Sequence, residues 1–501
     1  MLARFARTFT PRDSQYELLP TSERHSGYSK PRAPFPLPRW RVCRRCTATS
    51  LVTLFFAAAA FIGLLVWAHL SPWIWRTELL APIFGPHPLP PLYPEFRKAE
   101  LALPQHHVKD PFANGQKYLW IASHTWWSGW GNFMQDMVMN AHLTYRSGRT
   151  YVFDDYTWDK YGPPYQKFDE KRWIPSRIPI TALISGPIAG GPFADGDATP
   201  RAVAKAHFKK ICPNPTLVHG EELRALHGPG ADAARIEETW LEYLAKIDDP
   251  CVEVPEDSGS IFHNFMFGTR DEMMPVWPLL SSSPILQLFG WSTLAYSAFE
   301  TNRHLFAPAP LIPGYIADAS CPHCVDELSP LDGLLALHLR RGDFLEHCKN
   351  LCYWGANFMA FTRFSEFPDP WEMPGGSAEE RMPTYMRRCL PSVEEIVDKV
   401  TQVRASAAGR GLRSVYVMTN GDRAWLATLK SALRDAHGWE HVVTSRDLVL
   451  TNEEKYVSQA MDMMVGERAQ VFVGNGFSSL TSNIAMLRMA RKMDPETTHM
   501  W

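Results

Sequence analysis

The sequence predicts an α/β protein with two Rossmann-like lobes facing a cleft, preceded by one transmembrane helix. An uncharged stretch near the N-terminus predicts the membrane helix, and two later series of alternating strand and helix patterns predict the lobes. The chain has 501 residues, 45% hydrophobic and 21% charged, a composition that excludes a largely disordered protein. A net charge of −2 argues against a dedicated nucleic-acid binder.

The N-terminal region predicts a membrane anchor. Thr47 to Trp75 contains no Asp, Glu, Lys or Arg, and about 20 apolar helical residues cross a bilayer. Basic residues precede this stretch (Arg39, Arg41, Arg44 and Arg45). The positive-inside rule therefore predicts a cytosolic, disordered tail over 1–46, a transmembrane helix over 47–70 and a type II topology.

The chain beyond the anchor is expected in the lumen of the Golgi or the endoplasmic reticulum. Recurrent prolines over 71–112 predict an extended stem that holds the catalytic part off the membrane. Disulfides are the default state for cysteines in an oxidising compartment, and an odd number leaves one thiol unpaired. The cysteines concerned are Cys212, Cys251, Cys321, Cys324, Cys348, Cys352 and Cys389.

The first lobe is expected over 113–325. Tyr118–Ala122 is a short apolar run that predicts a buried strand. A glycine-containing turn follows, then a helical pattern over 133–145 and a second strand over 149–153. This order predicts a βαβ unit whose first loop lies at a carboxyl edge, where ligands bind.

The second lobe is expected over 326–501. Gly333–Leu339 is apolar except for His338, and further strands are expected over 414–419 and 469–474. Ser392 and Glu395 form a capping-box pattern that predicts a helix start. A last amphipathic helix is expected over 483–492.

Three loops at predicted strand ends carry candidate chemistry, and the first contains two glycines. Gly129 and Gly131 let the backbone approach a ligand closely, and Asn132 offers a donor and an acceptor. The alternative interpretation is a tight turn in which Asn132 caps the following helix.

The second loop follows the strand that contains His338. Because a strand alternates faces, His338 and Arg340 point the same way. Both are costly at the end of a buried strand unless they meet partners, and a diphosphate suits a guanidinium. The alternative is an ion pair between Arg340 and Asp343.

The third loop, from Gly474 to Thr481, precedes the last predicted helix. Backbone N–H groups and hydroxyls at a helix N-terminus bind anions, although a serine or threonine there is also typical of simple capping. Two aspartate pairs could hold a metal, but the charge of Arg340 and the donors of the third loop make one unnecessary, so no metal is expected. They are Asp195 with Asp197, and Asp154 with Asp155.

At these loops the sequence resembles the GDP-fucose protein O-fucosyltransferases. The resemblance rests on the turn Ser128–Asn132, the string His338-Leu-Arg340-Arg341, and the loop from Gly474 to Thr481. Asp462, 16 residues before the first serine of that loop, matches an acidic residue of the family. These islands occur in the family's order within residues 117–490.

The resemblance implies a GT-B-like fold that binds GDP-fucose without a metal and transfers fucose with inversion. It implies that Arg340 contacts the β-phosphate and glycosidic oxygen, and that Asn132 also takes part in catalysis. Residues implied to bind GDP-fucose are Gly129, Trp130, Gly131, Asn132, His338, Arg340, Asp462, Ser478, Ser479, Leu480 and Thr481.

Two departures from the family pattern leave alternatives open. Gly129 stands where some relatives carry a glutamate base, and Leu480 replaces the usual phenylalanine. The acceptor is either a protein Ser/Thr or a glycan hydroxyl. The alternatives are a GT-B enzyme that uses another nucleotide sugar, and a non-catalytic luminal sugar-binding module.

Overall fold

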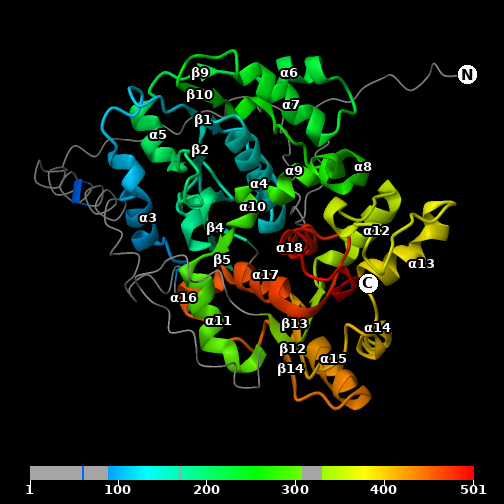
Figure 1. Cartoon of the computed structure of the whole chain (residues 1–501). Helices are drawn as coiled ribbons and strands as arrows, with labels where there is room; N and C mark the ends of the chain where they lie inside the picture. The colour runs from blue at the N-terminus through cyan, green and yellow to red at the C-terminus, as the bar shows by residue number, and fades with distance from the viewer. Residues whose placement is uncertain (1–58, 61–88, 169–171, 307–329) are drawn as a thin grey trace, which may run out of the picture. The chain divides into compact units, whose positions relative to one another are not determined.

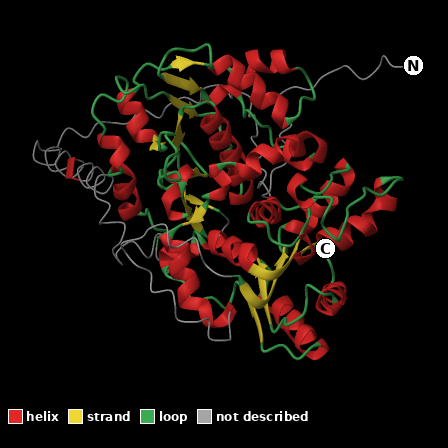
Figure 2. Cartoon of the chain, viewed as in Figure 1, coloured by secondary structure: helices red, strands yellow, loops and turns green. Residues whose placement is uncertain are grey.

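The computed structural model describes residues 59–60, 89–168, 172–306 and 330–501. Residues from Leu92 to Trp501 belong to one compact unit, which contains two parallel five-stranded sheets (Figures 1 and 2). The predicted transmembrane segment 47–70 lies outside the described residues except for Ala59 and Ala60. Within the described ranges, no helix has the length and apolar character needed to cross a membrane.

The N-terminal sheet confirms the first predicted βαβ unit. Its strands are all parallel, and their spatial order is β8 (Val203–Ala204), β2 (Thr150–Phe153), β1 (Tyr118–Ile121), β10 (Cys251–Val254) and β9 (Thr216–Leu217). Parallel strands need crossover connections, and α4 (Trp130–Arg146) supplies the one between β1 and β2.

The C-terminal sheet confirms the second series. Its parallel strands lie in the order β14 (His441–Thr444), β13 (Ser414–Thr419), β12 (Leu331–Leu339), β15 (Ala469–Gly474) and β16 (Thr498–Met500). The two strands predicted over 414–419 and 469–474 have these bounds. The central strand β12 is buried from Leu334 to Leu339, as expected where helices cover both faces of a parallel sheet.

The remaining strands form short antiparallel pairs: β3 (Tyr156–Thr157) with β6 (Arg177–Ile178), β4 (Tyr165–Lys167) with β5 (Trp173–Pro175), and β7 (Ile184–Ser185) with β11 (Gly290–Trp291). The described α-helices besides α4 are α3 (Pro94–Leu101), α5 (Lys205–Ile211), α6 (Gly220–His227), α7 (Ala233–Leu244), α8 (Arg270–Met273), α9 (Trp277–Ser282), α10 (Pro284–Gln287), α11 (Thr293–Phe306), α12 (Phe344–Trp354), α13 (Ala378–Cys389), α14 (Val393–Ala405), α15 (Arg423–Ala436), α16 (Asn452–Lys455), α17 (Ser458–Arg468) and α18 (Ser479–Ala490).

The alternation of side chains along β12 divides the core around the C-terminal sheet. Leu335, Leu337 and Leu339 pack in one hydrophobic cluster, whereas Leu334 and Ala336 pack in another. The second cluster includes residues of α17 and α18. His338 therefore faces the helices that lead into and out of β15, as the period of a strand requires.

The predicted extended stem differs from the structure at its C-terminal end. Pro94–Leu101 forms α3, with Pro94 at a first-turn position where a missing N–H costs nothing. Tyr93 is fully buried, and its hydroxyl donates to the backbone oxygen of Glu453 at 2.8 Å. The prolines were interpreted as helix-breaking throughout, but this segment packs as part of the folded unit.

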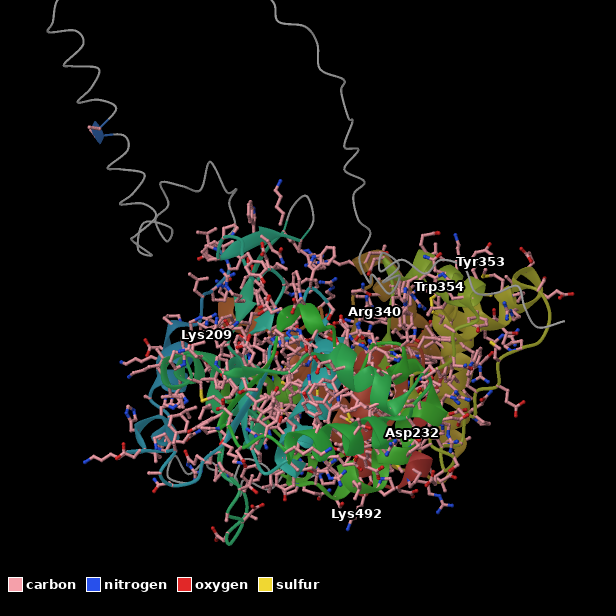
Figure 3. All side chains as sticks on the ribbon, turned by 90° about the horizontal axis from the view of Figure 1, so that it is seen from above. Lys209, Asp232, Arg340, Tyr353, Trp354 and Lys492 are labelled. Atoms are coloured by element: carbon pink, nitrogen blue, oxygen red, sulfur yellow. A yellow bond between two sulfur atoms is a disulfide. The ribbon has the colours of Figure 1, made fainter. Side chains whose placement is uncertain are left out.

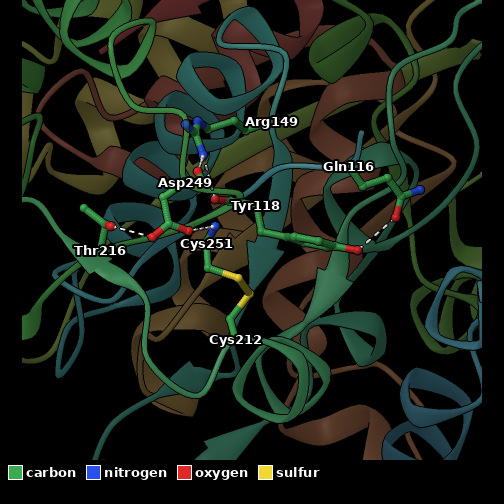
Figure 4. Close-up of a disulfide and its surroundings, with 7 residues drawn as sticks. All are labelled: Gln116, Tyr118, Arg149, Cys212, Thr216, Asp249 and Cys251. Carbon is green, nitrogen blue, oxygen red and sulfur yellow. Dashed lines mark hydrogen bonds between the residues drawn. A yellow bond between two sulfur atoms is a disulfide. The ribbon is translucent and has the colours of Figure 1, made fainter. Parts of the chain in front are cut away.

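Two disulfides confirm the prediction of oxidised cysteines. Cys212–Cys251 joins the end of α5 to the start of β10. Figure 4 shows this bridge beside Asp249, whose carboxylate accepts hydrogen bonds from the Cys251 N–H and the Thr216 hydroxyl. Cys348–Cys389 joins α12 to α13. Among the described cysteines, Cys352 is free and buried.

Candidate functional site

The first and third predicted loops meet where the N-termini of α4 and α18 abut. A Cβ atom placed on Gly131 would lie 2.5 Å from the Ser479 Oγ and 2.7 Å from the Leu480 backbone nitrogen. The Asn483 side chain donates to the Gly131 carbonyl at 2.8 Å, and Gln135 donates to the Ser482 hydroxyl at 2.9 Å. Gly131 therefore lets the backbone of the first loop approach the third loop closely, whereas the sequence predicted a close approach to a ligand.

A buried hydrogen bond joins the second loop to the third. The His338 Nδ1 lies 2.8 Å from the Thr481 Oγ1, and His338 is 3% exposed. Burial, followed by the charge of Arg340, lowers the pKa of His338 to about 3. His338 is therefore neutral at physiological pH, and it supports the loop through Thr481 and not by carrying charge.

Arg340 follows directly after β12 and makes the ion pair that was the alternative to a phosphate contact. Its Nη2 lies 3.2 Å from Asp343 Oδ2, and the two side chains are 27% and 25% exposed. The guanidinium also lies over the ring of Phe344, 4.6 Å from its centroid. The Arg340 Nε is buried and has no hydrogen-bond partner within the described residues. Nη1 also makes no hydrogen bond to a described residue, so the partly exposed guanidinium keeps donors for a ligand. Figure 3 labels Arg340 together with Tyr353 and Trp354 of α12.

The backbone around Arg340 is held by the end of the neighbouring strand β13. Asn420 accepts a hydrogen bond from the Arg341 N–H at 2.8 Å and donates to Asp343 at 2.7 Å. Arg341 lies over the Trp425 ring at 4.2 Å and donates to the Pro391 carbonyl. The two arginines therefore differ: Arg341 is anchored to the protein through both its charge and its backbone.

The third loop forms the start of α18, four residues earlier than the sequence predicted. Ser478 is the N-cap residue, but its hydroxyl makes no capping hydrogen bond. Neither the Ser478 nor the Ser479 hydroxyl bonds to another described residue. The first N–H groups of a helix lack intrahelical partners and favour an anion, so donors of the kind that bind phosphate gather here.

Aromatic packing holds this loop in place. The Gly476 carbonyl accepts hydrogen bonds from the Met359 N–H and the Thr362 hydroxyl. A Cβ atom on Gly476 would lie 2.3 Å from the Phe358 ring, and Phe358 stacks on Trp371 with centroids 4.6 Å apart. The glycine lets the loop lie directly on these rings.

Asp462 lies on α17 and contacts groups of the C-terminal sheet. It accepts hydrogen bonds from the Tyr416 hydroxyl and, at 3.3 Å, from the Ser445 hydroxyl. Burial raises the pKa of Asp462 to about 6, against the lowering effect of these hydrogen bonds. The predicted contact of Asp462 with GDP-fucose would compete with these two hydroxyls.

The predicted site residues of the first loop lie at the start of α4, and they differ in exposure. Gly129 is the N-cap residue of α4 and has open space around its Cα. Trp130 is buried against Phe133 and Tyr156. Asn132 lies inside the first turn, half-buried, and does not cap the helix. Its side chain has no hydrogen bond to a described residue.

Most charged groups at the carboxyl edge of the N-terminal sheet are paired with one another. Asp154 lies 2.7 Å from Lys205 and 3.3 Å from His124. Although burial acts to raise it, these two partners hold the pKa of Asp154 well below its usual range. Asp155 pairs with Arg97 at 3.0 Å.

Asp195 and Asp197, the other candidate pair of metal ligands, lie in a local turn. Asp197 accepts a hydrogen bond from the Thr199 N–H at 2.8 Å, and Asp195 is exposed. Across the described ranges, no three His, Cys, Asp or Glu side chains are grouped to hold a metal ion.

Two positioning residues were missed by the sequence reasoning. The first is Asn420, which holds Arg341 and Asp343 as described above. Trp501 donates from its indole to the His338 carbonyl at 2.9 Å and from its backbone to Gly474 at 3.1 Å. It thus joins the ends of β12 and β15. No motif marks either residue, because each acts through contacts between segments distant in sequence.

Comparison with known proteins connects this geometry to a family. The family model described as GDP-fucose protein O-fucosyltransferase matches residues 321–491, roughly a third of the chain. The matched stretch includes His338, Arg340 and the start of α18, and it leaves the loop at 128–132 outside. No curated protein sequence matches the chain.

Several solved structures are similar to this chain. POFUT1 in complex with GDP is 15% identical, with a TM-score of 0.46, and covers 77% of this chain and 98% of its own. NodZ alpha-1,6-fucosyltransferase soaked with GDP-fucose is 11% identical, with a TM-score of 0.34, covering 74% and 92%. A mutant of Arabidopsis thaliana FUT1 in complex with GDP is 12% identical, with a TM-score of 0.33, covering 82% and 75%. The resemblance inferred from the sequence is supported over residues 321–491, where this chain is similar to the GDP-fucose protein O-fucosyltransferases.

Proposed function

We propose that this chain is an inverting, metal-independent fucosyltransferase that moves fucose from GDP-fucose to a hydroxyl group of a protein or glycan. One observation carries the proposal. The matched stretch contains both the Arg340 loop and the start of α18, and the His338–Thr481 hydrogen bond joins them at one edge of the C-terminal sheet.

The donors at this edge suit a diphosphate. The Arg340 guanidinium, whose Nη1 has no hydrogen bond to a described residue, and the unbonded hydroxyls of Ser478 and Ser479 supply hydrogen bonds. The start of α18 adds partial positive charge. These groups would replace the charge that a divalent cation provides in other transferases.

In the transfer step, the bond between the fucose anomeric carbon and the diphosphate oxygen breaks, and its electron pair leaves with GDP. The acceptor oxygen bonds to the opposite face of the same carbon, which inverts it. Arg340 stabilises the charge that develops on the leaving group, a contribution worth several kcal/mol in comparable sites.

The acceptor proton has no evident base in the first loop. Gly129 carries no side chain, and Asp154 is committed to Lys205 and His124. We therefore assign the proton to solvent water on the acceptor side, because the acceptor oxygen attacks the face opposite the departing diphosphate. We assign to Asn132 a contact with the sugar or the acceptor, because its side-chain amide has no hydrogen bond to a described residue.

The two described disulfides support a place in the secretory pathway, where such bonds persist. Together with the uncharged stretch from Thr47 to Trp75, they support a single-pass type II membrane protein of the Golgi or endoplasmic reticulum with a luminal catalytic part. Protease treatment of sealed microsomes should shorten the chain only by its N-terminal tail.

Donor turnover tests the activity. Full-length protein in detergent is incubated with GDP-fucose in EDTA, and release of GDP is followed with and without acceptor extracts. A thermal-shift panel of GDP, UDP and CMP accompanies it, because only the bound nucleotide raises the melting temperature. Turnover in EDTA and a shift with GDP alone are the expected results.

Two outcomes lead to the alternatives. A shift with UDP or CMP in place of GDP indicates a transferase for another nucleotide sugar. A shift with GDP but no turnover with any acceptor extract indicates a non-catalytic binding module.

A further inference from the structure

Large aromatic side chains are exposed at the carboxyl edge of the N-terminal sheet. We call this group the aromatic rim; its members are Trp126 (42% exposed), Trp127 (52%), Tyr161 (78%) and Phe265 (49%). They lie on loops that follow β1, β3 and β10. Aromatic residues of this size are normally buried to a large extent, so a group of four exposed on neighbouring loops marks an interaction site.

Polar contacts join these loops into one surface. The Lys160 Nζ lies 5.3 Å from the centre of the Trp126 ring and 3.4 Å from a Glu256 carboxylate oxygen. The Tyr161 hydroxyl donates to the same carboxylate. An aromatic face, an ammonium, a carboxylate and a second aromatic ring therefore follow one another across three loops.

The rim is held in place by the backbone. Trp127 has a φ of 54°, which is rare for a bulky residue and points to a functional requirement. Its N–H donates to the Thr157 carbonyl at 2.9 Å. Lys160 donates to the Ala122 carbonyl at 3.2 Å, and the Thr125 hydroxyl to Asn264 at 3.4 Å. The exposed rings therefore stand on loops tied to each other and to the end of β1.

The rim lies close to the donor site. Four residues separate Trp127 from Gly131, so their Cα atoms are at most about 14 Å apart. Gly131 in turn contacts Ser479 at the start of α18. A molecule resting on the rim therefore reaches the position where fucose would be transferred.

The size and chemistry of the rim favour a small neutral ligand. Four rings, each about half exposed, offer about 400 Å² of aromatic surface, whereas a stable interface between folded proteins needs about 800 Å² on each side. A pyranose ring has a face of C–H groups that fits an indole or phenol. Its hydroxyls fit a neighbouring carboxylate such as that of Glu256, which Lys160 holds in place from below the surface.

We propose that the aromatic rim binds the acceptor, and that the acceptor is a neutral oligosaccharide. This inference rests on the proposed function, because it identifies the hydroxyl group that receives fucose as a sugar hydroxyl. Trp126 and Tyr161 supply stacking faces, and the Glu256 carboxylate, whose side chain is 37% exposed, accepts hydrogen bonds from sugar hydroxyls.

Saturation-transfer NMR on the full-length protein with saturating GDP tests the proposal. The probes are trisaccharides of glucose, N-acetylglucosamine, galactose, mannose and xylose, together with a Ser/Thr-containing peptide of the same mass. At least one trisaccharide should bind, and Trp126→Ala and Tyr161→Ala should each weaken it at least fivefold. Trp126→Phe should keep most of the affinity, and Tyr353→Ala, which removes an aromatic side chain 58% exposed on α12, should change it less than twofold.

The result overturns the proposal if no trisaccharide binds, if the peptide binds the rim instead, or if Trp126→Ala leaves the saccharide signal unchanged. Calorimetric titration of GDP into each variant distinguishes a loss of acceptor binding from a loss of donor binding. GDP affinity should stay within twofold of wild type in all four variants. Absence of GDP binding by the wild-type protein contradicts the proposed function, and loss of saccharide binding alone contradicts only the acceptor assignment.

Discussion

The carboxyl edges of the two parallel sheets differ in which side chains remain without a partner or exposed. At the C-terminal sheet, the Arg340 Nε and the hydroxyls of Ser478 and Ser479 have no partner among the described residues. At the N-terminal sheet, Asp154 is paired with Lys205 and His124, and the exposed groups are mainly aromatic.

This difference indicates that the same kind of strand edge suits different ligands in the two sheets, depending on which side chains remain unpaired. Unpaired hydrogen-bond donors beside a helix N-terminus favour a charged group such as a diphosphate. An edge whose charges are internally paired offers stacking surface and favours a neutral group. The donor and acceptor halves of a sugar-transfer reaction require this division.

Removing the two disulfides, one in each half of the folded unit, should give the largest loss of stability and tests the difference between the two sheet edges. Each closes a loop of similar length, with sequence separations of 39 and 41, so removing either should cost about 4 kcal/mol of unfolding free energy on a chain-entropy model. Only the Cys348→Ala/Cys389→Ala pair should also weaken GDP binding, because α12 begins directly after the Arg340 loop. Urea unfolding and GDP titration of both double variants check this. Equal loss of GDP affinity in Cys212→Ala/Cys251→Ala would contradict the division.

Arg340→Ala should lower turnover of GDP-fucose by about 100-fold or more, because the departing diphosphate loses its guanidinium. Initial rates of GDP release in EDTA measure this. Arg423→Ala removes an exposed arginine of the same sheet's helices and should leave the rate unchanged. Residual activity of Arg340→Ala above a tenth of wild type would remove Arg340 from its role.

A pair of glycine substitutions tests the contact between the two loops. Gly131→Ala places a Cβ within 2.7 Å of the Leu480 backbone nitrogen and should cost about 1–3 kcal/mol of stability, with weaker GDP binding. Gly129→Ala meets nothing within 4 Å and should be nearly neutral. Thermal unfolding and GDP titration distinguish them, and equal behaviour of the two variants would argue against the contact.

The buried His338 should make the C-terminal sheet sensitive to acid. Its pKa is lowered to about 3 by burial, below the usual value near 6.5, so the unfolded chain takes up the proton first. Stability is then fully present above pH 6.5 and is lost as the pH falls toward 3. Between pH 7 and pH 5 His338 should account for about 2 kcal/mol of this loss.

The His338→Asn variant supplies the comparison for this pH dependence. Its free energy of unfolding should decrease less than that of the wild type over the same interval in urea titrations. The opposite order of slopes would show that His338 is not buried in its neutral form.

Asp343→Asn should give the smallest effect on GDP binding, and it should raise the affinity instead of lowering it. Asp343 holds Arg340 at 3.2 Å and adds negative charge beside the expected diphosphate. A partly exposed ion pair of this kind is worth about 0.2–1 kcal/mol, so its removal should raise GDP affinity by roughly twofold to fivefold. A loss of GDP affinity in calorimetric titration would instead indicate that Asp343 positions Arg340 for binding.

The two sheets also differ in how well sequence patterns predicted them. Two strands of the C-terminal sheet have their predicted bounds, because β13 and β15 are continuous apolar runs bounded by turns. Ser392 and Glu395 form the expected capping box. In the N-terminal part, β8 and β9 have two residues each and are too short for a periodic signal.

The candidate site was predicted in its parts but not in its connections. His338, Arg340 and Ser478 were identified from strand ends and from a family resemblance. Sequence could not show that Thr481 bonds to His338 or that Gly131 contacts Ser479, because these pairs lie far apart in the chain. Helix α3 was missed because the prolines of this region were interpreted as predicting an extended chain, although Pro94 occupies a first-turn position of the helix.

The central claim is that a diphosphate binds between Arg340 and the start of α18 without a cation. Calorimetric titration of GDP and of guanosine into the full-length protein in EDTA tests it most directly. GDP should bind, and guanosine should bind at least 100-fold more weakly, because it lacks the group these donors hold. Equal affinity for the two, or GDP binding only after a divalent cation is added, would contradict the claim.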